Sequence, residues 1–325
     1  MKKYALHCAL GCLMINPWVV SAQNYPFKPI RLIVPYSSGA GPDFTAREIA
    51  RAITETSAQP VVIDNRPGAS ATLGHMLGAK ALADGYTLLL GTLGGLVSGP
   101  ALMGNKIGYD PIKDFTPIGL ATYVPYCLFI NSQLPANNLT EFISYAKSRP
   151  GQLNYSSPGI GTPNHIGGAM LVTLGGINLL HVPYKLGAQS IADLIAGTIQ
   201  VSITGLLTTM PHVRAARVKL LGCGTQQRLQ WAPDVPAINE TIPGYYNTGW
   251  WGLVGPKGLD KKQVQYLNQS MNRWLKMPAT VQRFQVAGLE VSTTSPDSYR
   301  EQILSDLNTW RTLIKDSHIT VDSLP

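Results

Sequence analysis

The stretch Pro35-Tyr36-Ser37-Ser38-Gly39-Ala40-Gly41-Pro42-Asp43 joins an apolar run at 30–34 to a segment with helical periodicity. Its glycines let a ligand approach the backbone closely, because no Cβ stands in the way. The first N–H groups of the following helix have no partner within the helix, and they lie at the positive end of its dipole. The turn therefore predicts a site for an anion such as a carboxylate or a phosphate.

A second stretch of the same type is Tyr155-Ser156-Ser157-Pro158-Gly159-Ile160-Gly161-Thr162-Pro163. It also follows a short predicted strand and enters a predicted helix. Two such loops indicate two facing lobes with a ligand between them.

Around these loops, apolar runs alternate with amphipathic segments. The runs at 30–34 and 61–63 are each followed by a loop and a helical pattern, the run at 88–90 is followed by a loop, and the same alternation recurs over 126–223. Continuous apolar runs of this kind are typical of parallel strands covered by helices on both faces. We therefore expect an α/β protein with two lobes, each a mainly parallel sheet flanked by helices. Residues 23–124 and 248–325 are predicted to form lobe 1, and residues 125–247 lobe 2.

Residues 1–22 have the pattern of an export signal. Lys2 and Lys3 precede a mostly apolar segment, and Val20-Ser21-Ala22 resembles the small-residue pattern at which export signals are cleaved. We expect the mature chain to begin near Gln23. A membrane-anchored helix is a weaker alternative because the apolar segment is short. A lipid anchor at Cys12 is also weaker, because few apolar residues precede it.

The composition is that of a globular protein with a sizeable core: 45% of the 325 residues are hydrophobic and 14% are charged. The net charge is +8, of which Lys2 and Lys3 of the signal contribute two. The other basic residues are scattered and no nucleic-acid-binding motif occurs, so nucleic acid is excluded as a partner. Beyond the signal, Cys127 and Cys223 lie in apolar strand-like runs. Export permits a disulfide, but cysteines in strands are commonly small buried residues, so we expect free thiols.

Motifs of catalysis are absent or incomplete. The Gly39-x-Gly41 pair lacks the third glycine of a dinucleotide fingerprint, and no phosphate loop, His-Glu-x-x-His, Cys-x-x-Cys or Gly-x-Ser-x-Gly motif occurs. His165 and His181 have no cluster of further metal ligands around them in the sequence. Together with the export signal and the paired anion loops, this favours a binding protein without catalytic residues, cofactor or metal, and we expect a monomer.

Several motifs in fixed order resemble the Bug-type solute receptors of tripartite tricarboxylate transporters, over nearly all of the mature chain. They are Pro29-Ile30-Arg31-x-Ile33-Val34-Pro35-Tyr36, Asn65-Arg66-Pro67-Gly68-Ala69, Asp84-Gly85-Tyr86-Thr87, Tyr155-x-Ser157-x-Gly159-x-Gly161-Thr162-x-x-His165, His181-Val182-Pro183-Tyr184-Lys185 and Gly249-Trp250-Trp251-Gly252-Leu253. The resemblance implies a two-lobed periplasmic binding protein fold, type II-like, with the ligand cleft between the lobes. It implies a receptor in the periplasm that closes on a small carboxylate and delivers it to a membrane permease.

In that family, backbone amides, hydroxyls and bridging waters hold the ligand carboxylates. Its two binding loops fall on residues 36–43 and 157–162 of this chain. With the anion-site argument, this implies the following ligand-binding residues: Tyr36, Ser38, Gly39, Ala40, Gly41, Asp43, Thr92, Ser157, Gly159, Gly161, Thr162, His165 and Thr204. The chain departs from the family pattern in the first loop, which usually has three glycines and a small hydroxyl residue: here Ala40 adds a methyl group and Pro42 lacks an N–H. Leu186 stands where the family usually has glycine, and Thr204 stands near a frequent acidic position.

Several of these residues have a second, structural interpretation. Asp43 either contacts the ligand or stabilises the start of its helix, and Thr162 either contacts the ligand or caps the next helix. His165 suits a residue that braces its loop, and Trp250 and Trp251 suit core or hinge packing. Two other functions stay open: an exported α/β enzyme acting on carboxylates in the same cleft, and a receptor that presents its ligand to a sensor protein.

Overall fold

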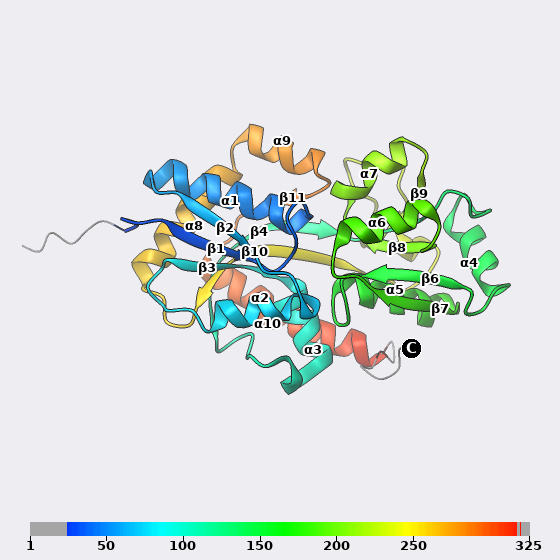
Figure 1. Cartoon of the computed structure of the whole chain (residues 1–325), viewed down its shortest axis with the longest axis horizontal. Coiled ribbons are helices and arrows are strands. Elements are labelled where there is room, and N and C mark those ends of the chain that lie inside the picture. Colours follow the sequence, from blue (N-terminus) through cyan, green and yellow to red (C-terminus); the bar gives the residue numbers. More distant parts are fainter. Residues whose placement is uncertain (1–24, 317–318, 320–325) are drawn as a thin grey trace, which may run out of the picture.

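The computed structural model describes residues 25–316 and residue 319, and shows two lobes side by side along the long axis of the molecule (Figure 1). The predicted export signal, residues 1–22, lies outside the described residues. Within the described part of the chain, no helix is both long and apolar enough to span a membrane.

The first lobe contains a six-stranded sheet in the order β11-β4-β10-β3-β1-β2. Figure 1 shows α1 and α9 above this sheet and α2, α3 and α10 below it, while α8 packs against α1. Its elements are β1 (Ile30–Val34), α1 (Gly41–Ser57), β2 (Val61–Asn65), α2 (Thr72–Ala79), β3 (Thr87–Thr92), α3 (Gly99–Met103), β4 (Phe115–Pro125), β10 (Thr248–Pro256), α8 (Lys261–Leu275), α9 (Pro278–Val286), β11 (Glu290–Val291) and α10 (Pro296–Asp316).

The second lobe contains a five-stranded sheet in the order β7-β6-β8-β5-β9. Helices α6 and α7 lie above this sheet in Figure 1, and α5 packs against β6, β7 and β8. Its elements are β5 (Cys127–Asn131), α4 (Leu139–Lys147), β6 (Leu153–Ser157), α5 (Pro163–Gly175), β7 (Leu179–Pro183), α6 (Gly187–Ala196), β8 (Val201–Thr204), α7 (Leu206–Arg214) and β9 (Val218–Cys223). Short turns of other helix types are η1 (Ala69–Ala71), η2 (Gly94–Ser98), η3 (Gly104–Ile107) and η4 (Ile238–Glu240).

The two-lobed α/β fold is confirmed, but both sheets are mixed where mainly parallel sheets were expected. Parallel pairing is limited to β2-β1-β3 in the first sheet and β7-β6-β8 in the second. The other strands pair antiparallel, because the chain passes between the lobes through β4 and β5 and returns through β10. We did not expect β4 to be a strand, since Pro117, Gly119 and Pro125 give its sequence the character of a turn.

The strands of the first sheet fall within residues 30–125 and 248–291, and those of the second within 127–223. We propose 23–124 with 248–325, and 125–247, as the extents of the two lobes. At their junction, the Gly224 N–H donates to the carbonyl of Tyr126 and the Asn247 N–H donates to the carbonyl of Gly224. These backbone bonds hold the outgoing and returning segments side by side.

Cys127 and Cys223 are joined by a disulfide, so the expectation of free thiols is wrong. They face each other directly as register partners on the antiparallel strands β5 and β9. Both are buried. The sequence could not reveal this bond, because the two cysteines have a sequence separation of 96 and only the pairing of β5 with β9 brings them together.

Candidate functional site

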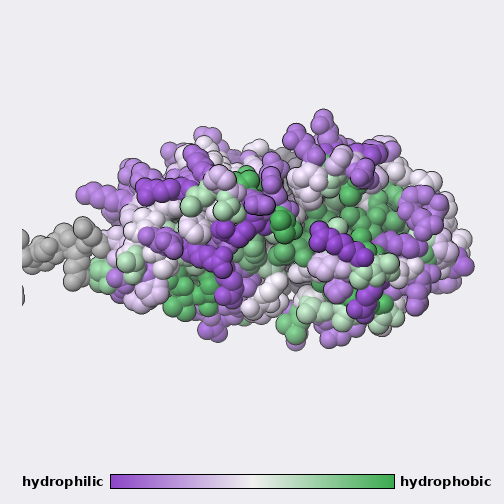
Figure 2. All heavy atoms as spheres, turned by 90° about the horizontal axis from the view of Figure 1, so that it is seen from above, coloured by the Kyte–Doolittle hydropathy of each residue, from purple (hydrophilic) through white to green (hydrophobic). Residues whose placement is uncertain are grey.

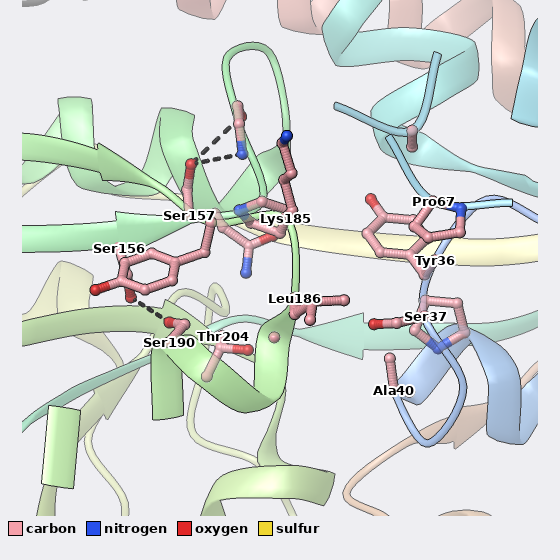
Figure 3. A pocket seen from close by; sticks show the side chains of 18 of the residues that line it. Tyr36, Ser37, Ala40, Pro67, Ser156, Ser157, Lys185, Leu186, Ser190 and Thr204 are labelled. Carbon is pink, nitrogen blue, oxygen red and sulfur yellow. Dashed lines mark hydrogen bonds between the residues drawn. The ribbon is translucent and has the colours of Figure 1, made fainter. Parts of the chain in front are cut away.

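A cavity of about 1590 Å³ lies between the two lobes. The strands β1 and β2 of lobe 1 and the strands β6, β7 and β8 of lobe 2 all end at it, as expected for ligands of α/β proteins. Figure 3 shows Tyr36, Ser37, Ala40 and Pro67 on one wall, facing Ser156, Ser157, Lys185, Leu186, Ser190 and Thr204 on the other. Both predicted glycine loops therefore contribute to one site.

Three helix N-termini open into this cavity without a side-chain cap. The N-cap residues of α1, α6 and α7 are Ala40, Leu186 and Gly205, and none makes a side-chain hydrogen bond to its helix. All three line the cavity. The usual capping residues, Ser, Thr, Asp and Asn, would satisfy these first N–H groups internally. Their absence leaves the first N–H groups of these helices, from both lobes, without a side-chain acceptor at the edge of the cavity.

The helix after the second glycine loop behaves differently. The Thr162 Oγ accepts the N–H of His165 and so caps α5, while Thr162 itself is fully buried and lies outside the cavity. Of the two roles left open for Thr162, the structure shows the cap. The free N-termini of lobe 2 are those of α6 and α7, which we did not predict.

Asp43 is also a structural residue in this arrangement. Its carboxylate is buried and accepts the Gly39 N–H at 3.0 Å, Arg47 Nε at 2.8 Å and Asn65 Nδ2 at 3.0 Å. Burial by itself raises the pKa of Asp43, but the hydrogen bonds from Arg47, Gly39 and Asn65 outweigh it and hold the pKa below its usual value. Asp43 does not line the cavity; it holds the first loop in shape.

The second loop is braced by two histidines, the buried His165 and the partly buried His181. The Oγ of Ser157 lies 2.6 Å from His181 Nε2 and accepts the Gly159 N–H at 3.0 Å. His165 Nδ1 accepts the Gly161 N–H at 3.3 Å, and burial lowers the pKa of His165 to about 3. Its Nε2 has no partner among the described residues. A neutral His165 that holds the loop through the Gly161 N–H agrees with the bracing role expected from the sequence.

The loop also touches lobe 1 directly. Ser98 Oγ donates to the Gly161 carbonyl at 2.7 Å, and Gly159, whose φ is +128°, lies against Ser70. A Cβ at Gly159 would come within 2.3 Å of the Ser70 Oγ. The loop therefore needs glycine at position 159 for both its backbone conformation and this close approach.

Of the predicted ligand-binding residues, eight line the cavity and five do not. The eight are Tyr36, Ser38, Gly39, Ala40, Gly41, Ser157, Gly159 and Thr204. The five outside it are Asp43, Thr92, Gly161, Thr162 and His165. Each of the five supports a neighbouring loop; Thr92, for example, accepts the Gly95 N–H at 3.2 Å. Ligand contact by any of the thirteen stays a prediction.

Trp250 and Trp251 also differ from each other. Trp250 is buried and donates its ring N–H to Asp306 on α10 at 2.6 Å, which is the expected core role. Trp251 is also buried, yet its ring edge reaches the cavity and lies so close to Gly41 that a Cβ there would approach to 2.5 Å. Trp251 thus forms the floor beneath the first loop.

Sequence reasoning missed three groups of cavity residues. Residues 64–68 were expected to form a turn and a helix was expected from about Ala69, but positive φ angles at Ala69, Ser70 and Ala71 delay α2 to Thr72 and make 67–72 a third wall of the cavity. A chain of buried hydroxyls runs from Ser190 to Ser156 at 2.7 Å and on to Ser202 at 3.2 Å. These serines come from α6, β6 and β8, so no local motif connects them.

The third group is cationic. Lys106, Lys185 and Arg217 line the cavity, no aspartate or glutamate does, and none of the three forms an ion pair within residues 25–316. In Figure 3 the Lys185 side chain points into the space between the two walls. Positive charge without counter-charge, together with free N–H donors, favours an anionic ligand.

Among the described residues, no group of three or more His, Cys, Asp or Glu side chains could hold a metal ion. The site therefore offers ligand recognition through backbone donors, hydroxyls and cations. Fold and site together define a two-lobed solute-binding protein of the periplasmic type.

Comparison with known proteins agrees with this class. The chain matches the tripartite tricarboxylate transporter family receptor over residues 45–319, and it belongs to this family. The periplasmic binding protein BugD is similar in structure, with a TM-score of 0.86 at 31% identity, covering 91% of this chain and 99% of BugD.

Two further solved structures contain ligands. Rpa4515 of R. palustris, with adipate, has a TM-score of 0.87 at 31% identity and covers 91% of this chain and 99% of its own. MatC from Rhodopseudomonas palustris, with bound malate, has a TM-score of 0.84 at 29% identity and covers 89% of this chain and 100% of its own. The Bug-type resemblance read from the sequence is confirmed.

Proposed function

We propose that this protein is a periplasmic receptor that captures a small carboxylate between its lobes and delivers it to a tripartite tricarboxylate-type membrane transporter. The observation that carries this proposal is the interlobe cavity, where uncapped N-termini of α1, α6 and α7 meet three cations that, in the described part of the chain, have no ion-pair partner and no acid beside them in the lining. The adipate and malate held by two relatives support a carboxylate as the anion.

The mechanism is closure of the lobes on the ligand. A carboxylate that touches the first loop of lobe 1 and the α6 N-terminus of lobe 2 at once favours the closed arrangement over the open one by its extra contacts there. Closure also removes the ligand from water, which strengthens its interactions with backbone N–H groups and with Lys185. The permease then distinguishes the closed, loaded receptor from the open, empty one.

Titration calorimetry and thermal unfolding against a panel of small carboxylates test the proposal on the protein isolated from the periplasm. A ligand at about 100 times its dissociation constant stabilises the folded state by roughly 2.7 kcal/mol. Lys185→Glu places an acid in the cavity and should weaken every acid that binds, whereas Lys113→Glu, on an exposed residue outside the cavity, should not. Absence of binding by any carboxylate would refute the proposal. Delivery is tested by comparing uptake of the bound acid in cells with and without this protein.

One observation favours an enzyme as the second candidate. Ser157 faces the cavity with its Oγ 2.6 Å from His181 Nε2, as in a nucleophile–base pair. Burial lowers the pKa of His181 to about 4, so the ring is a poor base near neutral pH, and no carboxylate bonds to it within the described chain. Mass spectrometry of bound ligand distinguishes the two: a chemically unchanged ligand supports a receptor, and turnover lost in Ser157→Ala supports the enzyme.

A further inference from the structure

The cavity extends beyond the space between the lobes into a groove between helices α6 and α7. Its lining includes Ala188, Ile191, Ala192 and Ile195, which recur at helical spacing and so form one face of α6. Leu207 and Pro211 from one face of α7 line it from the opposite side, together with Thr208 and His212. The two helices therefore leave an apolar channel open between them, whose lining is continuous with the cleft.

Strand register gives the direction of this channel. On β8, Thr204 pairs with Cys127 at the cleft end of β5, and on β9, Val218 pairs with Asn131 at the opposite end. Arg217 directly precedes Val218 and lines the same cavity. The channel thus runs the length of β5, roughly 13 Å at about 3.3 Å per residue, from the free helix N-termini to an unpaired arginine.

Side-chain size keeps the channel open. Ala188 and Ala192 are exposed and small, and the larger Ile191, Ile195 and Leu207 are only partly buried, so apolar surface faces the channel. Figure 2, which views the molecule from above, shows hydrophobic residues gathered on this lobe between hydrophilic ones. The whole cavity, at about 1590 Å³, exceeds the roughly 300–1,000 Å³ that small-molecule sites usually have. A small acid in the cleft would leave the channel unfilled.

We propose that the α6–α7 groove is a second part of the ligand site, and that the ligand is an elongated dicarboxylate with an apolar middle. One carboxylate binds at the N-termini of α1 and α6 in the cleft, the apolar body lies along α6, and the second carboxylate pairs with Arg217. This inference rests on the proposed function and adds to it a ligand class and a place for the ligand's far end. Charge complementarity at both ends of an apolar channel identifies the occupant.

Calorimetry with succinate, adipate, suberate and sebacate tests the groove. Each methylene that enters the channel should tighten binding by up to about fourfold, so affinity rises along the series until the channel is full. Ala192→Phe fills the channel and should abolish this rise while leaving succinate affinity unchanged. Ala279→Phe on α9, an exposed alanine outside the cavity, is the matched control.

A second variant tests the charged end. Arg217→Gln should weaken a long dicarboxylate about tenfold and the monocarboxylate of equal length much less, because only the former places a carboxylate at the guanidinium. Arg214→Gln removes a neighbouring exposed charge outside the cavity and should change neither. An affinity that is flat along the series, or equal effects of Ala192→Phe on short and long acids, would overturn the groove proposal alone. No binding of any carboxylate would overturn the proposed function with it.

Discussion

Replacing both Cys127 and Cys223 by alanine should destabilise lobe 2 by several kcal/mol. The disulfide closes a loop with a sequence separation of 96, which contains nearly all of that lobe. Cross-linking a chain over this distance lowers the entropy of the unfolded state, and the loop-length relation gives about 4–5 kcal/mol at 25 °C. This contribution is a large part of the stability of a typical domain.

Urea unfolding followed by far-ultraviolet circular dichroism measures this effect. The double variant should unfold at a clearly lower urea concentration than the oxidised protein, and its m-value should rise because its unfolded state is less compact. Adding a reductant should lower the urea midpoint of unfolding of the original protein to that of the variant, and should leave the midpoint of the variant unchanged.

Two results would refute the reasoning. Unfolded, unreduced protein that titrates with two free thiols would show that the bond does not form. A bonded protein whose midpoint equals that of the double variant would show that the loop-entropy argument fails for this lobe.

Three other predictions concern the cleft. Asp43→Ala removes a buried carboxylate that accepts hydrogen bonds from Gly39, Arg47 and Asn65, and should cost about 1–3 kcal/mol in urea unfolding. Because the pKa of Asp43 is lowered, this contribution is complete above pH 3.8, the usual pKa, and is lost as pH falls through the lowered pKa, so the original protein and the variant should converge in acid. Gly159→Ala drives a Cβ against Ser70 and strains the backbone at φ +128°, so it should weaken ligand binding in calorimetry; Ser70→Gly removes the clash alone and should restore binding only in part. Lys185→Met removes an unpaired cation and should reduce carboxylate affinity about tenfold and flatten its salt dependence, which an unchanged affinity would contradict.

Local pattern was enough to predict most elements. The apolar run at 30–34 and the spacing of Ala46, Ile49 and Ile53 correspond to β1 and to the buried face of α1. Strand β4 escaped prediction, because its prolines and Gly119 have low strand propensity and only pairing along the whole of β10 makes it a strand. The sense of pairing was likewise hidden, since a buried strand has the same apolar composition in parallel and antiparallel neighbours.

The candidate site likewise combines features that local sequence predicts with features that only the folded chain shows. The first glycine loop lines the cavity as its sequence suggested, because a strand, a glycine turn and a helix start are all local features. Thr162 illustrates the limit: a threonine before proline suits both a ligand contact and a helix cap, and only its place in the folded chain shows the cap. The serines Ser156, Ser190 and Ser202 meet from three separate elements, so nothing in the order of residues pointed to them.

By itself, the sequence determined the two-lobed α/β class, the family, and the position of the loops that face each other, because these depend on composition, periodicity and motifs short enough to act locally. Tertiary structure alone decided the disulfide, the mixed pairing of the sheets, and which side chains face the cavity. Those features join residues far apart in the chain: Cys127 meets Cys223, and Arg217 shares a cavity with Ala40. Contacts of this kind exist only once the strands have chosen their neighbours, and that choice depends on the packing of the whole core.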